Sequence, residues 1–301
     1  MEQYVKQFVR YLKEDKHASQ NTIVSYQRDL LKLCSYLEQH DITDVSMVTE
    51  TNLNSYILYM ETEGMASSTI SRHVATIKAF YLYLIRNHLV EQDIAYRLKP
   101  PKIEKKSPEA LTEEEIALLL AQPEGNGRKE LRDKAMLELL YATGMRVSEL
   151  ISLTVHQVNL EHGYIICKGS TYGRVIPVDE QTVEVMKRYL LEGRPAIVKG
   201  DTDILFSNIH GKPMTRQGFW KIVKLYAQKA GINREITPHM VRHSFAFHLI
   251  QHGADLHSVQ ELLGHSDIAT TGVYLMRPDQ RLKEVYNKTH QRDRIGEKKN
   301  G

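Results

Sequence analysis

The sequence predicts a mainly α-helical protein of two domains, with one small antiparallel β-sheet in the second domain. Three observations support this prediction. Apolar residues recur at helical spacing through residues 1–99, a segment rich in proline and charge follows at 100–108, and two short β-prone segments interrupt the otherwise helical remainder. At 301 residues the chain is also long for a single hydrophobic core.

The first 99 residues predict a bundle of four helices. Ser19 begins a polar run that offers an N-cap for the second helix, Gly64 is a plausible stop for the third, and Ser67 opens the fourth. The apolar residues of the first helix share one face: Val5, Phe8, Val9 and Leu12. Four such helices with short connections are typical of a small bundle.

A linker is predicted at residues 100–108. It contains three prolines and four charged side chains, so it is stiff and solvated. A Thr-x-x-Glu capping box at Thr112 then begins a new helix. We therefore expect one domain over residues 1–99 and a second over residues 109–301.

The second domain is predicted to be mostly helical around a β-hairpin. Residues 164–167 and 174–178 are β-prone and flank a glycine-containing turn. Helical patterns recur in five further segments: 180–191, 216–230, 239–252, 256–263 and 270–286.

Composition excludes several classes of protein and favours none strongly. Forty basic against 37 acidic residues give a net charge of +3, which is weak evidence for a nucleic-acid partner. Cys34 and Cys167 lie far apart, which argues against a zinc site or a disulfide framework and fits a reducing cytosol. No apolar run approaches the roughly 18 residues of a membrane span, and the first residues lack signal-peptide architecture. We expect a cytoplasmic protein with no metal.

Arg146 is the first candidate anion-binding group. It follows a Thr-Gly-Met turn and precedes a helix start, so its guanidinium could meet a phosphate beside helix N-terminal N–H groups. Glu149 lies one helical turn further on and could orient a cationic or imidazole partner. The alternative is a surface ion pair between Arg146 and Glu149. When Arg146 is considered alone, this alternative is favoured.

His239 and Arg242 project from the same face of one predicted helix, because they are three residues apart. An amphipathic helix with exposed His and Arg is the alternative. A metal site that includes His243, His248 and His252 is disfavoured, since no Glu lies between the i, i+4 histidine pairs.

Tyr274 is the candidate nucleophile. A free tyrosine hydroxyl, with a pKa of about 10, reacts poorly unless cations and donors hold an anionic electrophile before it. Tyr274 follows His265 by nine positions, and it is one of sixteen tyrosines, so order and spacing give it meaning. Lys168, at the hairpin turn, could protonate a leaving oxygen. The alternatives are a core tyrosine, a helix-end histidine and a solvated lysine.

Together these residues, in this order, resemble the tyrosine recombinase (phage integrase) family over essentially the whole chain. Three motifs are specific in combination: Thr-Gly-Met-Arg-Val-Ser-Glu-Leu, Pro-His-Met-Val-Arg-His-Ser-Phe-Ala and Leu-Leu-Gly-His-Ser. Residues 19–30 and 71–84 look like the core-binding domain of that family. Residues 281–290 are close to its Xer branch, which resolves bacterial chromosome dimers.

The resemblance implies the tyrosine recombinase fold, with a SAM-like, DNA-binding core-binding domain at residues 1–99 and a catalytic domain at residues 109–301. It implies an enzyme that cuts and rejoins DNA at specific sites through a 3′-phosphotyrosyl intermediate. The family clamps DNA between the two domains. No metal or nucleotide cofactor is implied, because the covalent bond conserves the energy of the phosphodiester.

The resemblance also assigns roles. Tyr274 would attack the scissile phosphate, Arg146 and Arg242 would clamp its non-bridging oxygens, and His239 and His265 would donate hydrogen bonds and assist proton transfer.

Two further roles follow from the same resemblance. Lys168 would protonate the departing 5′-oxygen, and Glu149 would act on the catalytic groups without contacting the DNA itself. DNA contacts outside the reacting centre would come from five residues of the second and fourth helices, for which a solvated helix face is the alternative: Ser19, Asn21, Thr22, Arg72 and Lys78.

The implied partners are a double-stranded recombination site and other recombinase subunits. Active assemblies of the family are tetramers, here of one or two kinds of subunit, in which a C-terminal helix docks on the neighbour. Leu282, Val285 and Tyr286 would form that docking stripe. Docking within the same chain is the alternative. An accessory DNA translocase and a place at the nucleoid would complete the expectation.

Three functions fit this resemblance. The first is Xer-type resolution of chromosome or plasmid dimers at cell division. An integrase of a transposon or phage is disfavoured because the chain begins directly with the bundle, without an arm-binding domain. A non-cleaving DNA-binding protein is disfavoured because every member of the catalytic set is present.

Overall fold

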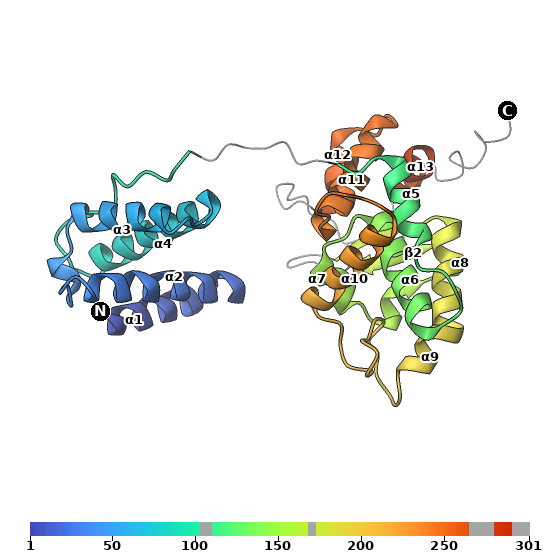
Figure 1. Ribbon diagram of the computed structural model, residues 1–301, viewed down its shortest axis with the longest axis horizontal. Coiled ribbons are helices and arrows are strands. Elements are labelled where there is room, and N and C mark those ends of the chain that lie inside the picture. Colours follow the sequence, from blue (N-terminus) through green and yellow to red (C-terminus); the bar gives the residue numbers. More distant parts are fainter. Residues whose placement is uncertain (103–109, 168–172, 265–279, 291–301) are drawn as a thin grey trace. The chain divides into compact units, whose positions relative to one another are not determined.

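The computed structural model describes residues 1–102, 110–167, 173–264 and 280–290, without the side chains of 280–283. The chain divides into two compact units, Met1–Lys106 (unit 1) and Ser107–Gly301 (unit 2). In Figure 1, unit 1 runs from blue to cyan and unit 2 from green to red. The mainly helical fold class with one small antiparallel sheet is confirmed. Most of the predicted linker lies outside the described residues.

The described part of unit 1 contains four α-helices packed around one apolar core. They are α1 (Glu2–Glu14), α2 (Gln20–Glu38), α3 (Glu50–Thr62) and α4 (Ser67–Arg86), with a 3₁₀ turn at Val45–Met47. Side chains from all four helices are almost completely buried: Phe8, Leu30, Leu53 and Leu84. Ser19 caps α2 as expected, since its hydroxyl accepts the backbone N–H of Thr22 at 3.1 Å.

A buried polar network crosses this bundle at Asp29. Its Oδ2 accepts a hydrogen bond from the Thr76 hydroxyl at 3.1 Å and pairs with the guanidinium of Arg72. Its Oδ1 lies 3.1 Å from Nε2 of His73, whose Nδ1 lies 3.1 Å from the Tyr56 hydroxyl. Burial alone would raise the pKa of Asp29, but the contacts with His73 and Arg72 together hold it below its ordinary value.

We expect Asp29→Asn to destabilise unit 1 in a pH-dependent way. Folding lowers the pKa of Asp29, so its contribution is present at neutral pH and lost as the pH falls through that lowered pKa. The substitution should lower the free energy of unfolding by about 3 kcal/mol at pH 7, and by less below about pH 4. Urea titrations followed by circular dichroism measure this change, and a difference that stayed equal at pH 7 and pH 3 would contradict it. Trp220, the single tryptophan, reports unit 2 as the internal control.

The described part of unit 2 is mostly helical and carries the sheet. Its helices are α5 (Glu113–Ala121), α6 (Arg128–Thr143), α7 (Val147–Ser152), α8 (Glu180–Arg188), α9 (Arg194–Ile197), α10 (Arg216–Lys229), α11 (Pro238–Gln251), α12 (Leu256–Leu263) and α13 (Gln280–Thr289). A 3₁₀ turn at Val155–Gln157 precedes the sheet, and a π-helical turn at Tyr189–Gly193 joins α8 to α9.

The sheet has the order β1-β2-β3, and both pairings are antiparallel. Strands β2 (Tyr164–Cys167) and β3 (Arg174–Pro177) form the predicted hairpin, with Ile165 opposite Ile176. Strand β1 (Val158–Asn159) was not predicted, because two residues are too few to show an alternating pattern.

Helix α6 packs against α7, α8, α9 and α11 and is buried on almost every side. It even contains a buried ion pair, with Arg132 Nη2 at 2.6 Å from Asp133 Oδ1. The Tyr226 hydroxyl donates to the other carboxylate oxygen at 3.1 Å. A helix that is buried all round lacks an exposed polar face, so its sequence shows little amphipathic periodicity.

Gly144 ends α6 in the left-handed region, at φ 56°, and places its backbone against α11. A Cβ at this position would lie 2.3 Å from Cδ1 of the buried Phe245. Both the backbone strain and the clash require glycine here.

We expect Gly144→Ala to lower the free energy of unfolding of unit 2 by about 3 kcal/mol, the sum of strain and overpacking. Guanidinium titrations followed by Trp220 fluorescence measure it. Gly253→Ala is the matched control, because Gly253 also has positive φ (90°) but no atom within 4 Å of its added Cβ. It should cost only about 1 kcal/mol. Equal losses in the two variants would show that Phe245 is not the cause.

Candidate active site

Arg146 occupies the N-cap position of α7. Its backbone N–H donates to Glu149 Oε2 at 2.6 Å, and its Nη1 lies 3.3 Å from Glu149 Oε1. The ion pair that the sequence offered as an alternative is therefore present. The Arg146 side chain nevertheless remains 44% exposed, so part of the guanidinium is available to an incoming anion.

Arg174, the first residue of β3, is the main partner of Glu149. Its Nη1 and Nη2 donate to the two carboxylate oxygens at 2.8 and 2.9 Å, which is the bidentate geometry of a strong charge-assisted pair. Burial alone would raise the pKa of Glu149, but Arg174, joined by Arg146, holds it below its ordinary value. Glu149 is therefore an ionised, mostly buried carboxylate in contact with both Arg174 and Arg146.

Arg242 projects from α11 into the same region. Its Nη1 donates to the carbonyl of Gly144 at 2.6 Å and its Nη2 to the carbonyl of Leu263 at 2.9 Å. Burial, followed by the charges of Arg146 and Arg174, lowers the pKa of Arg242 to about 10. Such crowding of positive charge is costly, and a bound anion would relieve it.

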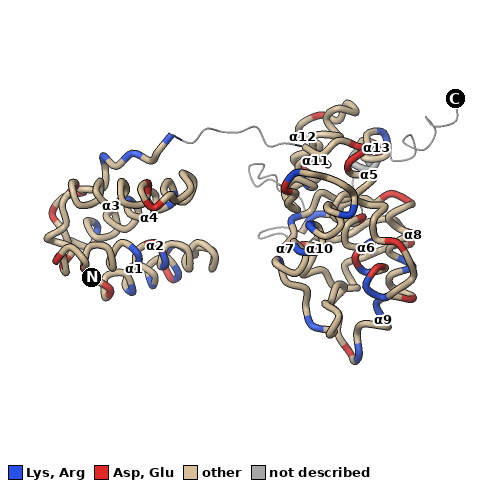
Figure 2. The backbone as a smooth tube through the Cα atoms, in the orientation of Figure 1, with Lys and Arg blue, Asp and Glu red and all other residues tan. Residues whose placement is uncertain are grey.

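The three arginines meet at the C-terminal end of α12. Arg174 Nε donates to the carbonyl of Leu262 at 2.9 Å, Arg242 to that of Leu263, and Arg146 Nη2 to that of Gly264 at 3.1 Å. The last carbonyls of a helix have no partner within the helix and carry partial negative charge. This helix end therefore gathers cationic side chains from the N-cap of α7, from β3 and from α11. Figure 2 marks the positions of Lys and Arg along the backbone in blue.

The structure thus brings together Arg146, Glu149 and Arg242 and adds Arg174, which the sequence reasoning missed. One signal could have pointed to Arg174, because Glu149 was expected to have a cationic partner. No local pattern, however, shows that β3 approaches α7. His239 lies one turn before Arg242 on α11 and is exposed. Lys168, His265 and Tyr274 lie outside the described residues, so their predicted roles stay predictions.

The five predicted DNA contacts lie on unit 1, and four of them have partners within the chain. Ser19 and Thr22 join their hydroxyls at 2.8 Å in the cap of α2, and Asn21 beside them is exposed. Arg72 pairs with Asp29. Lys78 Nζ donates to the carbonyl of Tyr96 at 3.0 Å.

Helix α13 packs against its own unit, which is the alternative that the sequence left open. The Tyr286 side chain is 1% exposed, and its hydroxyl donates to the carbonyl of Ala142 at 2.9 Å. His252 Nδ1 lies 2.6 Å from the carbonyl of Thr289, at the end of the helix. Val285 is partly buried against the same core, and the Leu282 side chain lies outside the described residues.

Two of the histidines weighed as metal ligands, His248 and His252, have other partners. His248 is buried with its Nδ1 2.9 Å from the Tyr141 hydroxyl, and burial lowers its pKa. Among the residues that the structure describes, no group of three or more His, Cys, Asp or Glu could hold a metal ion. Within the same residues, no helix is both long and apolar enough to cross a membrane.

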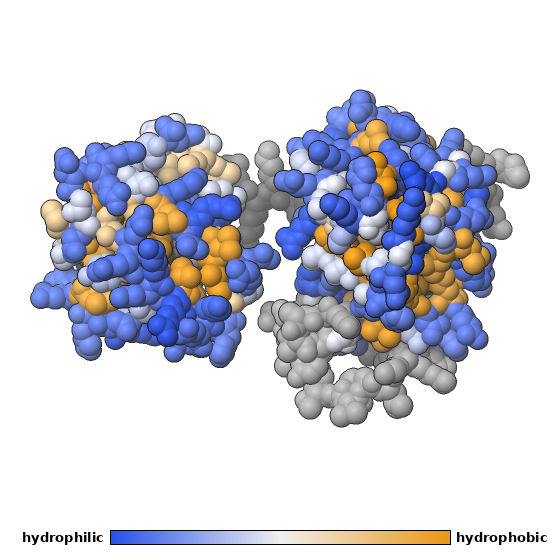
Figure 3. Space-filling view, turned by 90° about the horizontal axis from the view of Figure 1, so that it is seen from below, coloured by the Kyte–Doolittle hydropathy of each residue, from blue (hydrophilic) through white to orange (hydrophobic). Residues whose placement is uncertain are grey.

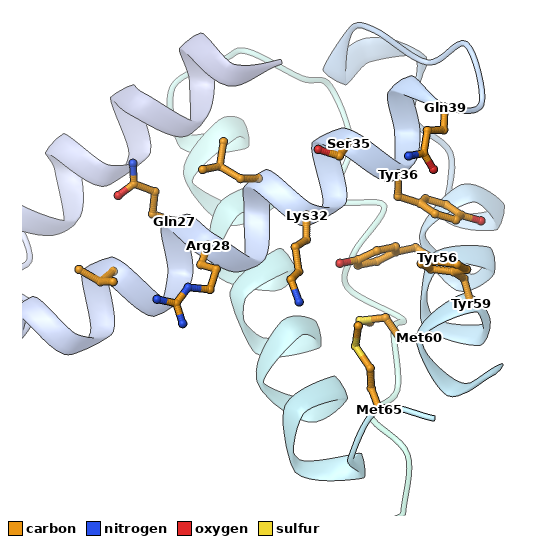
Figure 4. A pocket seen from close by; sticks show the side chains of 12 residues that line it. Gln27, Arg28, Lys32, Ser35, Tyr36, Gln39, Tyr56, Tyr59, Met60 and Met65 are labelled. Carbon is orange, nitrogen blue, oxygen red and sulfur yellow. The ribbon is translucent and has the colours of Figure 1, made fainter. Parts of the chain in front are cut away.

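A groove of about 600 Å³ lies in unit 1 beside α2 and α3. Figure 4 shows Arg28 and Lys32 extending from α2, with Tyr36, Tyr56 and Tyr59 gathered further along. Hydrophobic residues also reach the surfaces of both units, as the orange areas of Figure 3 show. The residues that line this groove all belong to unit 1, whereas the predicted catalytic residues all lie in unit 2.

Comparison with known proteins identifies the family. Residues 5–88 match the phage integrase N-terminal SAM-like domain, and residues 109–281 match the phage integrase family. The chain belongs to the phage integrase family. It is 40% identical to tyrosine recombinase XerD of Oceanobacillus iheyensis over 296 residues, which cover 97% of this chain and 99% of that one. It is 42% identical to tyrosine recombinase XerD of Halalkalibacterium halodurans, with 96% and 97% covered.

Solved structures of a recombinase and of an integrase share the fold. A XerH site-specific recombinase bound to a palindromic difH substrate, in a post-cleavage complex, has a TM-score of 0.70 at 25% identity, covering 97% of this chain and 82% of that chain. A lambda integrase dimer bound to a COC′ core site has a TM-score of 0.71 at 15% identity, with 96% and 95% covered. The expectation of a tyrosine recombinase is confirmed, and the chain is a site-specific DNA strand-exchange enzyme.

Proposed function

We propose that this recombinase resolves chromosome or plasmid dimers at cell division, as an Xer-type enzyme. The identity of about 40% to tyrosine recombinase XerD over nearly the whole chain supports this role. The single observation that carries the chemistry is the cluster of Arg146, Arg242 and Arg174 around one carboxylate, Glu149. Such a cluster has an excess of positive charge, which suits a phosphodiester whose negative charge grows as it reacts.

We assign the covalent step to Tyr274. Its phenolic oxygen forms a bond to the scissile phosphorus, the bond from phosphorus to the 5′-oxygen breaks, and a 3′-phosphotyrosyl linkage results. Lys168 gives a proton to the departing 5′-oxygen, while His239 and His265 assist removal of the phenolic proton. The reverse sequence, with the 5′-hydroxyl of another strand, rejoins the DNA.

Arg146 and Arg242 stabilise the phosphate during this step. Both carry donors close to the end of α12, and Arg146 is the more exposed of the two. Preorganised cations aimed at developing negative charge are typically the largest contribution to such catalysis. Glu149 acts through Arg146, because it accepts the Arg146 backbone N–H.

We further propose how the assembly forms on DNA. Residues 1–99 act as the core-binding domain and residues 109–301 as the catalytic domain, with Ser19, Asn21, Thr22, Arg72 and Lys78 at the DNA. Four subunits of one or two kinds bind two recombination sites, and α13 leaves its own unit to dock on the neighbour. An accessory DNA translocase at the nucleoid would start cleavage.

A nicked suicide substrate tests the chemistry. After cleavage the short 5′-hydroxyl strand diffuses away, so the protein remains bound to DNA and migrates slowly in a denaturing gel. Mass spectrometry of the adduct should place the nucleotide on Tyr274, and its attachment to any other residue would contradict the assignment.

The cellular role is tested by deleting the gene from its host. Unresolved dimers should then produce filamentous cells, which the wild-type gene corrects; a deletion strain that divides normally would contradict the Xer-type role.

Lys168→Ala should slow cleavage by about a hundredfold, because the 5′-oxygen leaves poorly without a proton. A substrate with sulfur in place of that bridging oxygen should restore the rate to within about threefold of wild type, since a thiolate leaves without protonation. The rates are measured in single turnovers on both substrates. If sulfur gave no rescue, Lys168 would not be the general acid.

A further inference from the structure

We propose that Arg174 is a positioning residue that holds Glu149, so that Glu149 contacts the guanidinium of Arg146 only at 3.3 Å and part of that guanidinium stays available to the scissile phosphate. This inference rests on the proposed function, because it concerns how Arg146 reaches that phosphate. It adds a specific task for a side chain that does not touch DNA in the proposed mechanism.

The donors of Arg174 point inward. Nε, Nη1 and Nη2 donate to the carbonyl of Leu262 and to the two oxygens of Glu149. Its side chain is only 14% exposed, against 44% for Arg146. Arg174 therefore uses its planar fork on the protein itself, whereas Arg146 keeps part of its fork in solvent.

Glu149 makes shorter contacts with the guanidinium of Arg174 than with the guanidinium of Arg146. Its bonds to Arg174 are 2.8 and 2.9 Å, while the distance from Arg146 Nη1 is 3.3 Å. The carboxylate is 11% exposed, so it cannot rely on water if a partner is lost. A buried carboxylate without a partner is strongly disfavoured.

Without Arg174, the nearest cation for Glu149 is Arg146. Arg146 and Glu149 both lie at the start of α7, and the backbone N–H of Arg146 already donates to the Glu149 carboxylate. The Arg146 guanidinium therefore has only a small distance to move. Once it closes on Glu149, its charge is neutralised and its donors turn away from the phosphate. Arg174 prevents this capture by saturating Glu149 first.

The position of Arg174 also fixes the backbone at the end of α12. A Cβ at Gly264 would lie 2.6 Å from Nη1 of Arg174, so this glycine and this arginine are in close contact. Gly264 has φ 65° and directly precedes His265 in the sequence. The same side chain therefore contacts both Glu149 and the last turn of α12.

Arg174→Met tests the proposal through the charge of the substrate. We would measure single-turnover cleavage on two suicide substrates, one with the natural phosphate and one with a neutral methylphosphonate at the scissile position. On the phosphate, the rate should fall about thirtyfold, because Arg146 no longer neutralises the reacting group. On the methylphosphonate, which has no negative charge for Arg146 to meet, the loss should be at most about threefold.

Three more variants separate positioning from a scaffold role. Adding Glu149→Gln to Arg174→Met removes the carboxylate that would capture Arg146, so the double variant should recover about tenfold on the phosphate. Arg194→Met is the matched control, since Arg194 also donates to backbone carbonyls in unit 2, at Ile204. It should cleave at the wild-type rate. If Arg174→Met does not fold, Arg174→Lys, which keeps a charge but loses the fork, is measured on the same two substrates, and its loss on the phosphate should be smaller but again larger than its loss on the methylphosphonate.

The outcomes are distinct. Wild-type rates for Arg174→Met, or equal losses on the two substrates, would overturn the proposal, as would a double variant slower than the single one. A wild-type protein that forms no adduct on either substrate would instead overturn the proposed function itself.

Discussion

Replacing Tyr274 by phenylalanine should abolish covalent attachment to the suicide substrate. The change removes one oxygen, and that oxygen is the atom proposed to bond to phosphorus. No neighbouring group supplies a nucleophile in its place in the proposed mechanism, so the rate of adduct formation should fall by at least about 10⁴-fold. DNA binding should remain within about threefold of wild type, because the hydroxyl contributes at most one hydrogen bond.

The measurement is the fraction of labelled DNA that stays with the protein in a denaturing gel. Tyr96→Phe is the matched control: Tyr96 is 75% exposed in unit 1, and its loss of a hydroxyl should leave the adduct unchanged. Adduct that persists in Tyr274→Phe at the wild-type level would remove Tyr274 from the mechanism.

Arg242→Lys should reduce the rate of cleavage by about a thousandfold while leaving DNA affinity nearly intact. Arg242 donates from two nitrogens to the carbonyls of Gly144 and Leu263, and an ammonium on a shorter, single-headed chain cannot reproduce both bonds. Burial and the neighbouring guanidinium groups of Arg146 and Arg174 lower the pKa of Arg242 to about 10. A lysine in this place would have a greater tendency to lose its proton.

Single-turnover rates on the suicide substrate measure this effect, with binding followed separately by fluorescence anisotropy. Arg194→Lys provides the control for a conservative change at another arginine that binds carbonyls. A rate within tenfold of wild type for Arg242→Lys would mean that any cation suffices at this position and that the guanidinium fork of Arg242 is not needed.

Local signals predicted those elements whose ends are marked by their own residues. The helix expected at 256–263 coincides with α12, because Asp255 caps its start through Ser258 and Gly264 ends it with positive φ. The hairpin was predicted from its β-prone strands and glycine-containing turn, and β2 and β3 lie there. These patterns act over a few residues and can be read without knowledge of the fold.

Other features depend on contacts between distant segments. Arg174 and Glu149 are 25 residues apart, and nothing in either segment indicates that they form a bidentate pair. Arg72 was predicted to contact DNA, and in the structure its guanidinium pairs with the buried Asp29, which lies 43 residues earlier in the sequence. Sequence order identified the catalytic set through resemblance, but the charge distribution around it required the three-dimensional structure.

The end of α12 has a consequence for genetics. The acceptors that Arg146, Arg174 and Arg242 use there are main-chain carbonyls, which every amino acid carries. Side-chain replacement at Leu262 or Leu263 therefore changes packing but cannot delete an acceptor, and a mutational survey should find apolar exchanges tolerated there. Gly264 should tolerate none, because any side chain would displace Arg174. Single side-chain substitutions at the end of α12 therefore cannot remove the hydrogen bonds that hold the three arginines. Replacing an amide by an ester, which weakens the carbonyl as an acceptor, would reveal their contribution.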